Sequence, residues 1–211
     1  FPASVEVEGA PEGLARWATA AMQMALDELP WMVCVDFSAS SPLVRRAVRE
    51  GKVRSVDVQR PVTDPAAAIQ IGYALGADMV VLFAVQSYQV TAEPVQVEVV
   101  LGGQAYEVKP NFDEQRLQAR EQLQVYRAFG VVGRSKARAR FTGPEGVLAR
   151  EALRSAAYKA AQVLAGVPPE QVKEAPVAKK RRKGPRWLLY LLAIGALSSS
   201  VVGWGAHTRP V

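Results

Sequence analysis

The sequence has almost none of the residues on which most catalytic and metal sites depend. It contains one cysteine, Cys34, and one histidine, His207, among 211 residues. A single cysteine excludes a disulfide within the chain and a metal site built from several thiolates. Because the only histidine lies near the C-terminus, residues 1–178 can form no Ser-His-Asp triad, no Cys-His pair and no usual zinc site. We therefore predict a non-catalytic protein without a metal site or cofactor; an enzyme would need an active site without histidine.

Acidic residues are absent from the last part of the chain. Residues 179–211 hold seven Lys or Arg and no Asp or Glu, whereas residues 1–178 hold 19 basic and 20 acidic residues. The formal net charge of +6 therefore belongs to the C-terminal part, and the preceding body is close to neutral. Nucleic-acid binding rests on neutralising phosphates with a basic surface, so the body lacks the main support for that function. We expect no nucleic-acid partner.

Residues 187–204 contain no charged side chain at all. At about 1.5 Å per residue, a helix of this length reaches the lower limit for crossing a hydrocarbon core about 30 Å thick. Trp187, Tyr190 and Trp204 lie near its ends, where amphipathic rings prefer the level of the lipid headgroups. We predict a single-pass transmembrane helix over residues 187–206, anchored by these three aromatic residues, and a short tail over residues 207–211.

A cluster of cations precedes this apolar run immediately. Only Arg209 lies on the far side, so the positive-inside rule places residues 1–178 in the cytoplasm, with the extracytoplasmic side as the alternative. The same cations suit anionic lipid headgroups. A nuclear-import signal, an RNA-binding patch and a buried helix of a soluble protein are the competing interpretations. The cluster, over residues 179–186, consists of Lys179, Lys180, Arg181, Arg182, Lys183 and Arg186.

Three small residues recur every four positions within the predicted span. Gly195, Ser199 and Gly203 therefore share one helix face, and such a face permits close approach of a second helix. The pattern predicts lateral association of the helix, or it reflects small residues that are merely tolerated.

The body over residues 1–166 is expected to be one domain of the α/β (α+β) class. Apolar residues recur first at alternating strand and helix spacings, then in a series of strands, and last in an Ala-rich helix. This order predicts a mixed β-sheet packed with three to four helices. The expected strands are 4–8, 31–37, a minor one over 53–60, 79–91, 95–101, a hairpin partner after a Gly102-Gly103 turn, and 125–141. The expected helices are 12–29, 42–50, 66–75 and 147–165.

The body and the basic cluster are separated by a proline-punctuated segment. Residues 167–178, V-P-P-E-Q-V-K-E-A-P-V-A, lack an apolar stripe and contain three prolines. This composition is typical of a linker, so we expect the body to be held about a dozen residues from the membrane.

Residues 63–85 resemble a passage of bacterial envelope domains of the curli-secretion (CsgG-like) type and the TolB amino-terminal type. In those families a helix ends in L-G-A-D and a buried strand follows, as in A-L-G-A-D-M-V-V-L-F-A-V here. A strand pair and an Ala-rich helix then close the domain, which residues 147–165 resemble. The resemblance implies an α/β fold without known catalytic residues and assigns no site. Two departures are that Ala84 stands where those domains usually have glycine, and that those domains lie outside the cytoplasm.

Two places in the body are candidates for contact with a ligand or partner. Asp36 ends the expected strand 31–37, and α/β sheets often bind ligands at such strand ends. The other place is a stripe of alternate cations on one strand face. It is either a solvated face balanced by neighbouring acids or a surface for anionic lipids, phosphates or a partner. The stripe consists of Arg134, Lys136, Arg138 and Arg140.

Three further residues are expected to fill the core of the body. Trp17 and Trp31 have the size of core anchors, and Cys34 lies in the apolar run W-M-V-C-V-D-F, where a small buried residue fits. An interaction role for a tryptophan and a reactive thiol are the less favoured interpretations.

Together these features predict a single-pass, membrane-anchored α/β domain that binds a partner protein or assembles at a bacterial membrane. Membrane attachment would raise the effective concentration of the domain near its partners. The alternatives are a membrane-tethered sensor that binds a small ligand near Asp36, a histidine-free enzyme, and nucleic-acid binding through the tail alone.

Overall fold

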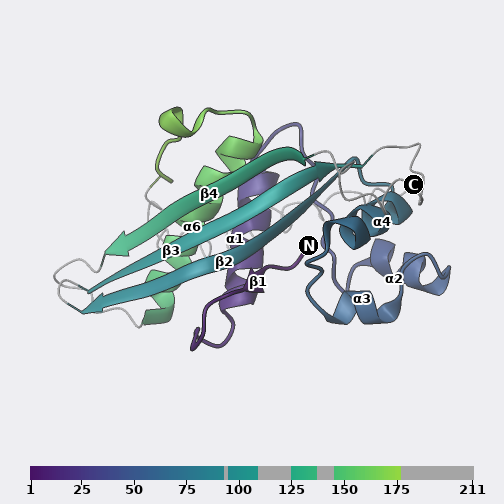
Figure 1. Ribbon diagram of the computed structural model, residues 1–211, viewed down its shortest axis with the longest axis horizontal. Coiled ribbons are helices and arrows are strands. Elements are labelled where there is room, and N and C mark those ends of the chain that lie inside the picture. Colours follow the sequence, from purple (N-terminus) through teal and green to yellow (C-terminus); the bar gives the residue numbers. More distant parts are fainter. Residues whose placement is uncertain (93–94, 109–124, 137–144, 177–211) are drawn as a thin grey trace, which may run out of the picture. The chain divides into compact units, whose positions relative to one another are not determined.

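The computed structural model describes residues 1–92, 95–108, 125–136 and 145–176, and within them a four-stranded mixed sheet (Figure 1). The strand order is β1-β2-β3-β4, with β1 parallel to β2 and the other pairs antiparallel. The predicted class, a mixed sheet packed with helices, is confirmed. The strands are β1 (Ser4–Val5), β2 (Met79–Ala92), β3 (Val95–Glu107) and β4 (Val125–Lys136).

Helices cover one face of the sheet and one end of the other face. In Figure 1, α1 (Leu14–Asp27) and α6 (Glu145–Leu164) lie behind the sheet, and both contribute to the main core. On the opposite face, α4 (Pro65–Leu75) packs over the start of β2 and the end of β3. The helices α2 (Pro42–Arg49) and α3 (Ser55–Gln59) gather beside α4. We call the sheet face opposite α1 and α6 the open face.

The helix α4 shows how local sequence sets its boundaries. The carboxylate of Asp64 accepts a hydrogen bond from the amide of Ala67 at 3.2 Å, and Pro65 occupies the first turn, where no amide partner is lost. Gly76 ends the helix with φ of 71°, a left-handed conformation that glycine adopts without steric cost. The helix predicted over 66–75 is confirmed.

The main core depends on a close contact between α6 and the sheet. Alanine is the commonest buried residue of α6, and five of its alanines are completely buried at 0% exposure: Ala149, Ala152, Ala156, Ala157 and Ala160. Opposite them, Gly133 of β4 has no room for a side chain. A Cβ placed on Gly133 would lie 2.6 Å from the backbone nitrogen of Ala156 and 2.7 Å from its Cβ. The small residues on both elements therefore let the helix backbone approach the strand closely.

A β-bulge in β2 changes which residues of the strand point to the helix-covered face of the sheet. Val85 pairs with Leu101 and Ser87 with Val100, so Gln86 is an extra residue in β2. Before the bulge, Phe83 and Val85 point to the helix-covered face; after it, Tyr88 does. The strand predicted over 79–91 is confirmed, and the bulge shifts its alternation by one residue.

The hairpin turn predicted at Gly102-Gly103 is wrong, because both glycines lie within β3 and pair with both neighbours. A side chain at either position would collide with neighbouring residues. A Cβ on Gly103 would lie 2.6 Å from Cζ of Phe129 and 2.7 Å from Cβ of Phe83, and one on Gly102 would collide with the carboxamide of Gln86. In the middle of a strand, glycine here serves close packing and not a turn.

The buried strand predicted over 31–37 is also wrong. Among the described residues, no carbonyl accepts a backbone hydrogen bond from the amides of residues 33–37, and the segment is irregular. Just before β1, the amide of Ala3 donates a hydrogen bond to Thr19 Oγ1 of α1 at 2.8 Å. Trp31 is 54% exposed and so is no core anchor, whereas Trp17 is confirmed as a partly buried residue packed on the main core.

The minor strand predicted over 53–60 is instead the short helix α3. The guanidinium of Arg54 donates twice to the carboxylate of Asp57, at 2.8 and 2.9 Å, across this single turn. Val53 is buried while Val56 is exposed, a spacing that does not suit strand alternation. Residues of α2, α3 and α4 enclose a second small core that includes Phe37, Val44, Ala47, Val53 and Ile71.

The chain after α6 turns back along that helix. It passes through η2 (Pro169–Gln171), and the side chain of Gln162 then makes hydrogen bonds of 2.9 Å to both the amide and the carbonyl of Lys173. The ammonium of Lys159, at 2.5 Å, holds the pKa of Glu174 below its ordinary value. The first part of the predicted linker 167–178 is therefore attached to α6.

Residues Phe1–Ala175 form one compact unit. The predicted basic cluster 179–186, transmembrane helix 187–206 and tail 207–211 lie outside the described residues. Within the described ranges, no helix has both the length and the apolar character needed to cross a bilayer.

The close contact at Gly133 leads to a stability prediction. We expect Gly133→Ala to lower the free energy of unfolding by about 1–3 kcal/mol, because the added methyl group meets backbone atoms of α6 that cannot rotate away. The matched control is Gly130→Ala on the same strand, where a Cβ would have nothing within 4 Å. Denaturant unfolding of the purified chain measures both, and equal losses for the two variants would contradict this account.

Candidate functional site

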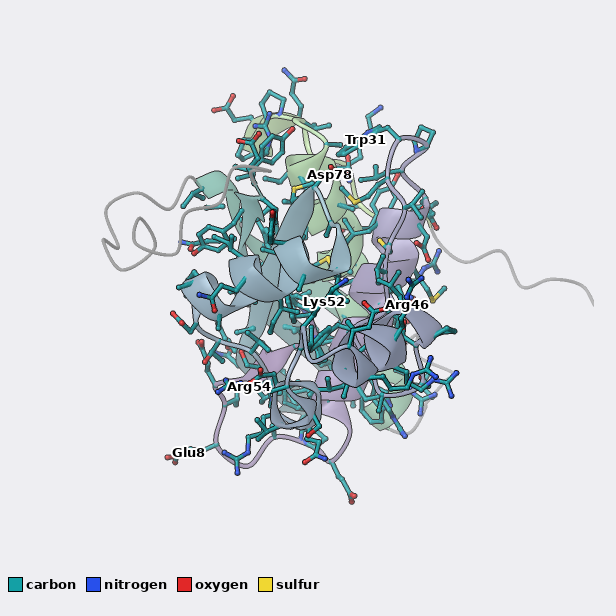
Figure 2. The ribbon with its side chains drawn as sticks, turned by 90° about the vertical axis from the view of Figure 1, so that its right-hand side faces the viewer. Glu8, Trp31, Arg46, Lys52, Arg54 and Asp78 are labelled. Atoms are coloured by element: carbon teal, nitrogen blue, oxygen red, sulfur yellow. The ribbon has the colours of Figure 1, made fainter. Side chains whose placement is uncertain are left out.

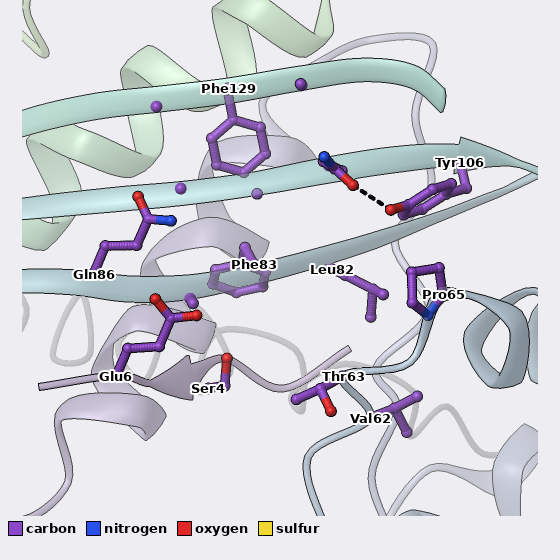
Figure 3. Close-up of a pocket in the computed structure, with 16 residues that line it drawn as sticks. Ser4, Glu6, Val62, Thr63, Pro65, Leu82, Phe83, Gln86, Tyr106 and Phe129 are labelled. Atoms are coloured by element: carbon purple, nitrogen blue, oxygen red, sulfur yellow. Dashed lines mark hydrogen bonds between the residues drawn. The ribbon is translucent and has the colours of Figure 1, made fainter. Parts of the chain in front are cut away.

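A hollow in the described part of the protein lies on the open face of the sheet (Figure 3). Its floor is a row of small residues on neighbouring strands, because Ala84 pairs with Gly102 and Gly102 pairs with Gly130. Ser4 of β1 pairs with Ala84 and extends the row to the sheet edge. With no large side chain in this row, the face is recessed, and the hollow has a volume of about 490 Å³.

Polar side chains stand at both ends of this hollow. At one end the hydroxyl of Tyr106 donates to the carboxamide oxygen of Gln104, with Thr63 and Pro65 from the start of α4 nearby. At the other end, Figure 3 shows Gln86 and Glu6 close together, Gln86 from the bulge and Glu6 from the end of β1. The bulge thus places a carboxamide over Gly102, in agreement with the tendency of bulges to redirect side chains at functional positions.

The chemistry of this hollow is that of hydrogen bonding. Burial, with a smaller contribution from Asp64, raises the pKa of the Tyr106 hydroxyl, so the phenol stays protonated and acts as a hydrogen-bond donor. Glu6 is the one carboxylate among the lining residues, and no lysine, arginine or histidine lines the hollow. Two carboxylates for acid–base catalysis are therefore not brought together here. Within the described residues, no group of His, Cys, Asp and Glu side chains could hold a metal ion.

Asp36, the predicted ligand-contacting residue, lies in an exposed loop beside a small cavity. Its carboxylate accepts a hydrogen bond of 2.5 Å from Ser38 Oγ, which lies 2.8 Å from Ser40 Oγ. The cavity has a volume of about 70 Å³ and is lined largely by apolar residues. It has room for roughly two waters, well below the roughly 300–1,000 Å³ of small-molecule sites. The loop hydrogen bonds are a sufficient structural role for Asp36.

The predicted cationic stripe is described only in part. Arg134 and Lys136 lie on the open face at the end of β4, because the alternate residue Ser135 is buried on the other face. Arg134 donates to the carboxylate of Glu98 on β3 at 2.6 Å, so one of the two cations is balanced by a neighbouring acid. Arg138 and Arg140 lie outside the described residues.

The segment after α1 exposes three large apolar side chains that were predicted to be buried. Trp31, Val33 and Val35 are 54%, 92% and 49% exposed, and Figure 2 shows Trp31 at the periphery of the molecule. They alternate with Met32 and Cys34, which pack against the main core. One side of the segment thus fixes it to the domain while the other side presents apolar surface to solvent. Contiguous exposed apolar surface is the kind that a partner can cover.

Comparisons with known proteins place the chain in no established family. No family model matches it, and no curated protein matches it. Among solved structures, the 1.65 Å structure of the hypothetical protein CT253 from Chlamydia trachomatis matches with a TM-score of 0.47 and 9% sequence identity, over 79% of this chain and 95% of that chain. At this level, the match carries no argument about function.

Sequence reasoning missed the sheet hollow and the exposed segment for different reasons. Gly102 and Gly130 lie 28 positions apart along the chain, and only the β3–β4 register brings them together. Val33 is exposed because segment 31–37 has no strand partner among the described residues, which its apolar sequence does not reveal.

Cys34 is partly buried, and burial together with a hydrogen bond to Asp27 raises the pKa of its thiol to about 11. We expect slow alkylation by iodoacetamide at pH 8, because only the thiolate reacts, and a rate that continues to rise up to about pH 11. The unfolded chain in denaturant is the control and should react at pH 8 at least tenfold faster, since an unperturbed thiol has a pKa near 8.5. A folded protein that reacts fully at pH 7 would contradict the prediction.

Proposed function

We propose that this protein is a membrane-anchored, non-catalytic α/β domain that binds a partner protein at a bacterial membrane. The single observation that carries the interaction role is the row of exposed apolar side chains at Trp31, Val33 and Val35. The cost of leaving such side chains in water is recovered when a partner covers them, at roughly 25 cal/mol per Å² of apolar area.

The anchoring part of the proposal rests on the sequence after the described domain. The charge-free run 187–204 and the six preceding cations support a single-pass helix with the domain on the cytoplasmic side. The repeated small residues Gly195, Ser199 and Gly203 support lateral association of such helices. The attachment of residues 167–174 to α6 shortens the free tether, so the domain would be held close to the bilayer.

The resemblance to CsgG-like and TolB amino-terminal domains supports an envelope setting for this proposal. The passage that carries it forms the predicted helix, glycine stop and strand as α4, Gly76 and β2. Those families lie outside the cytoplasm, so the side of the membrane is the part of the proposal on which the resemblance and the positive-inside rule disagree.

A second candidate function is recognition of a polar group in the sheet hollow. The hollow of about 490 Å³ falls in the range of binding sites, and its hydrogen-bonding groups are supplied by Gln86, Gln104, Tyr106 and Glu6. It replaces the vicinity of Asp36 as the place where a small ligand or a partner side chain would fit.

A photo-crosslinking amino acid at Val33 tests the interaction surface. We expect a discrete adduct from intact membranes, and loss of most of that adduct with the added substitution Trp31→Ser, without a drop in melting temperature, because both side chains are solvent-exposed. The matched control position is Val90, which is 46% exposed on β2. Equal adducts from both positions would contradict the proposal. If Gly130→Leu removed the adduct while Trp31→Ser left it unchanged, the hollow would instead be identified as the binding site.

Membrane integration and sidedness form a separate test. We expect the protein to stay in the pellet after an alkaline wash, since an inserted helix is not removed by charge disruption. On sealed inside-out vesicles, protease should then degrade residues 1–178, because the positive-inside rule places them on the cytoplasmic side. Release by the wash would contradict the anchor, and protection of the domain would place it on the extracytoplasmic side.

A further inference from the structure

The positive charge of the body is concentrated in one exposed lobe. We call residues 42–60, which comprise α2, α3 and the chain between them, the basic lobe. It carries six cations and two acids, whereas the remainder of residues 1–178 carries 13 cations and 18 acids. All six cations are exposed, and Figure 2 looks onto this end of the domain with Arg46, Lys52 and Arg54 labelled. The six are Arg45, Arg46, Arg49, Lys52, Arg54 and Arg60.

The two acids of the lobe are already engaged. The carboxylate of Glu50 forms ion pairs with Lys52 at 2.8 Å and with Arg46 at 2.7 Å. These two cations lower the pKa of the Glu50 carboxyl to about 2. The carboxylate of Asp57 forms an ion pair with Arg54 at 2.8 Å. Three cations of the lobe therefore have no ion-pair partner among the described residues, namely Arg45, Arg49 and Arg60.

The arrangement on α2 is unfavourable for the isolated domain. Val44 and Ala47 are buried in the small core, so the opposite face of this helix turns outward with Arg45 and Arg49 one helical turn apart. Like charges at this spacing repel each other. The negative end of the helix dipole compensates Arg49 in the last turn, but not Arg45 in the middle. An anionic surface opposite the lobe would remove this repulsion.

Exposed aliphatic side chains accompany these cations. Leu43 and Val56 are each 42% exposed within the lobe. Residues 42–60 contain no aromatic residue. The lobe therefore has no side chain on which the bases of a single-stranded nucleic acid could stack. Cations beside aliphatic groups suit the headgroup region of a bilayer, where charge and apolar surface are both available.

We infer that the basic lobe is a second membrane contact, which docks the domain on anionic phospholipid headgroups. This inference rests on the proposed membrane anchor, because ten residues, 177–186, separate the described domain from the predicted span and reach at most about 36 Å when extended. The acidic remainder is repelled by the same bilayer surface, so the charge asymmetry orients the domain with α2 and α3 towards the lipid.

The test uses the full chain in lipid nanodiscs. A fluorophore is attached at Val56→Cys in a Cys34→Ala background, and its collisional quenching by a headgroup spin-labelled lipid is measured. We expect quenching at least about threefold stronger in discs with roughly a third phosphatidylglycerol than in phosphatidylcholine alone, and loss of the difference near 1 M salt. A fluorophore at Gln89→Cys, exposed on β2, should show no such difference.

Two triple variants that remove the same total charge distinguish an effect of the basic lobe from an effect of net charge. Arg45→Gln, Arg49→Gln and Arg60→Gln together should abolish the phosphatidylglycerol effect. Arg16→Gln, Lys136→Gln and Lys173→Gln remove the same charge from exposed positions outside the lobe and should preserve it. Melting temperatures of both variants confirm that the fold is kept.

The inference is overturned by any of three results: equal quenching in both lipids, equal loss in both triple variants, or a lipid effect that survives neutralisation of the lobe. Tighter binding of a short RNA than of the anionic disc, lost in the lobe variant, would overturn it in favour of a nucleic-acid surface. Failure of the proposed membrane anchor would give a different result, because a chain without an inserted helix would not copurify with phosphatidylcholine discs at all.

Discussion

The packing of the alanine face of α6 against the sheet is the contact on which the rest of this structure depends. Alanines such as Ala152 and Ala156 lie against Gly133, so helix and strand backbones approach more closely than larger residues would allow. Around this contact the core is filled by buried aliphatic side chains such as Leu101 and Leu153.

The periphery of the domain is divided into surfaces of different character. The segment around Val33 presents apolar side chains, the sheet hollow presents carboxamides and a phenol, and the lobe around Arg45 presents positive charge. In the proposed membrane-anchored protein, attachment would limit the search of these surfaces to partners at the same membrane.

Periodic elements were predictable from sequence, and features that depend on pairing were not. The helices α1, α2, α4 and α6 follow from apolar spacing with proline and glycine signals at their ends. Segment 31–37 has a strand-like composition, but it has no strand partner among the described residues. Gly102-Gly103 looks like a turn because the crowding by Phe83 and Phe129 is invisible in one dimension. Of the candidate site, the Arg134 stripe was visible, whereas the hollow needed the strand register.

The central claim is that segment 31–37 is an unpaired stretch that offers its apolar side chains for recognition. Hydrogen exchange of the full chain, followed by mass spectrometry of peptides from 31–37 and from 79–85, tests it most directly. The account predicts exchange of the 33–37 amides at least about a hundredfold faster than those of β2, because no described carbonyl accepts their hydrogen bonds. Protection equal to that of β2 would show that the segment is a strand of the sheet, and would contradict the claim.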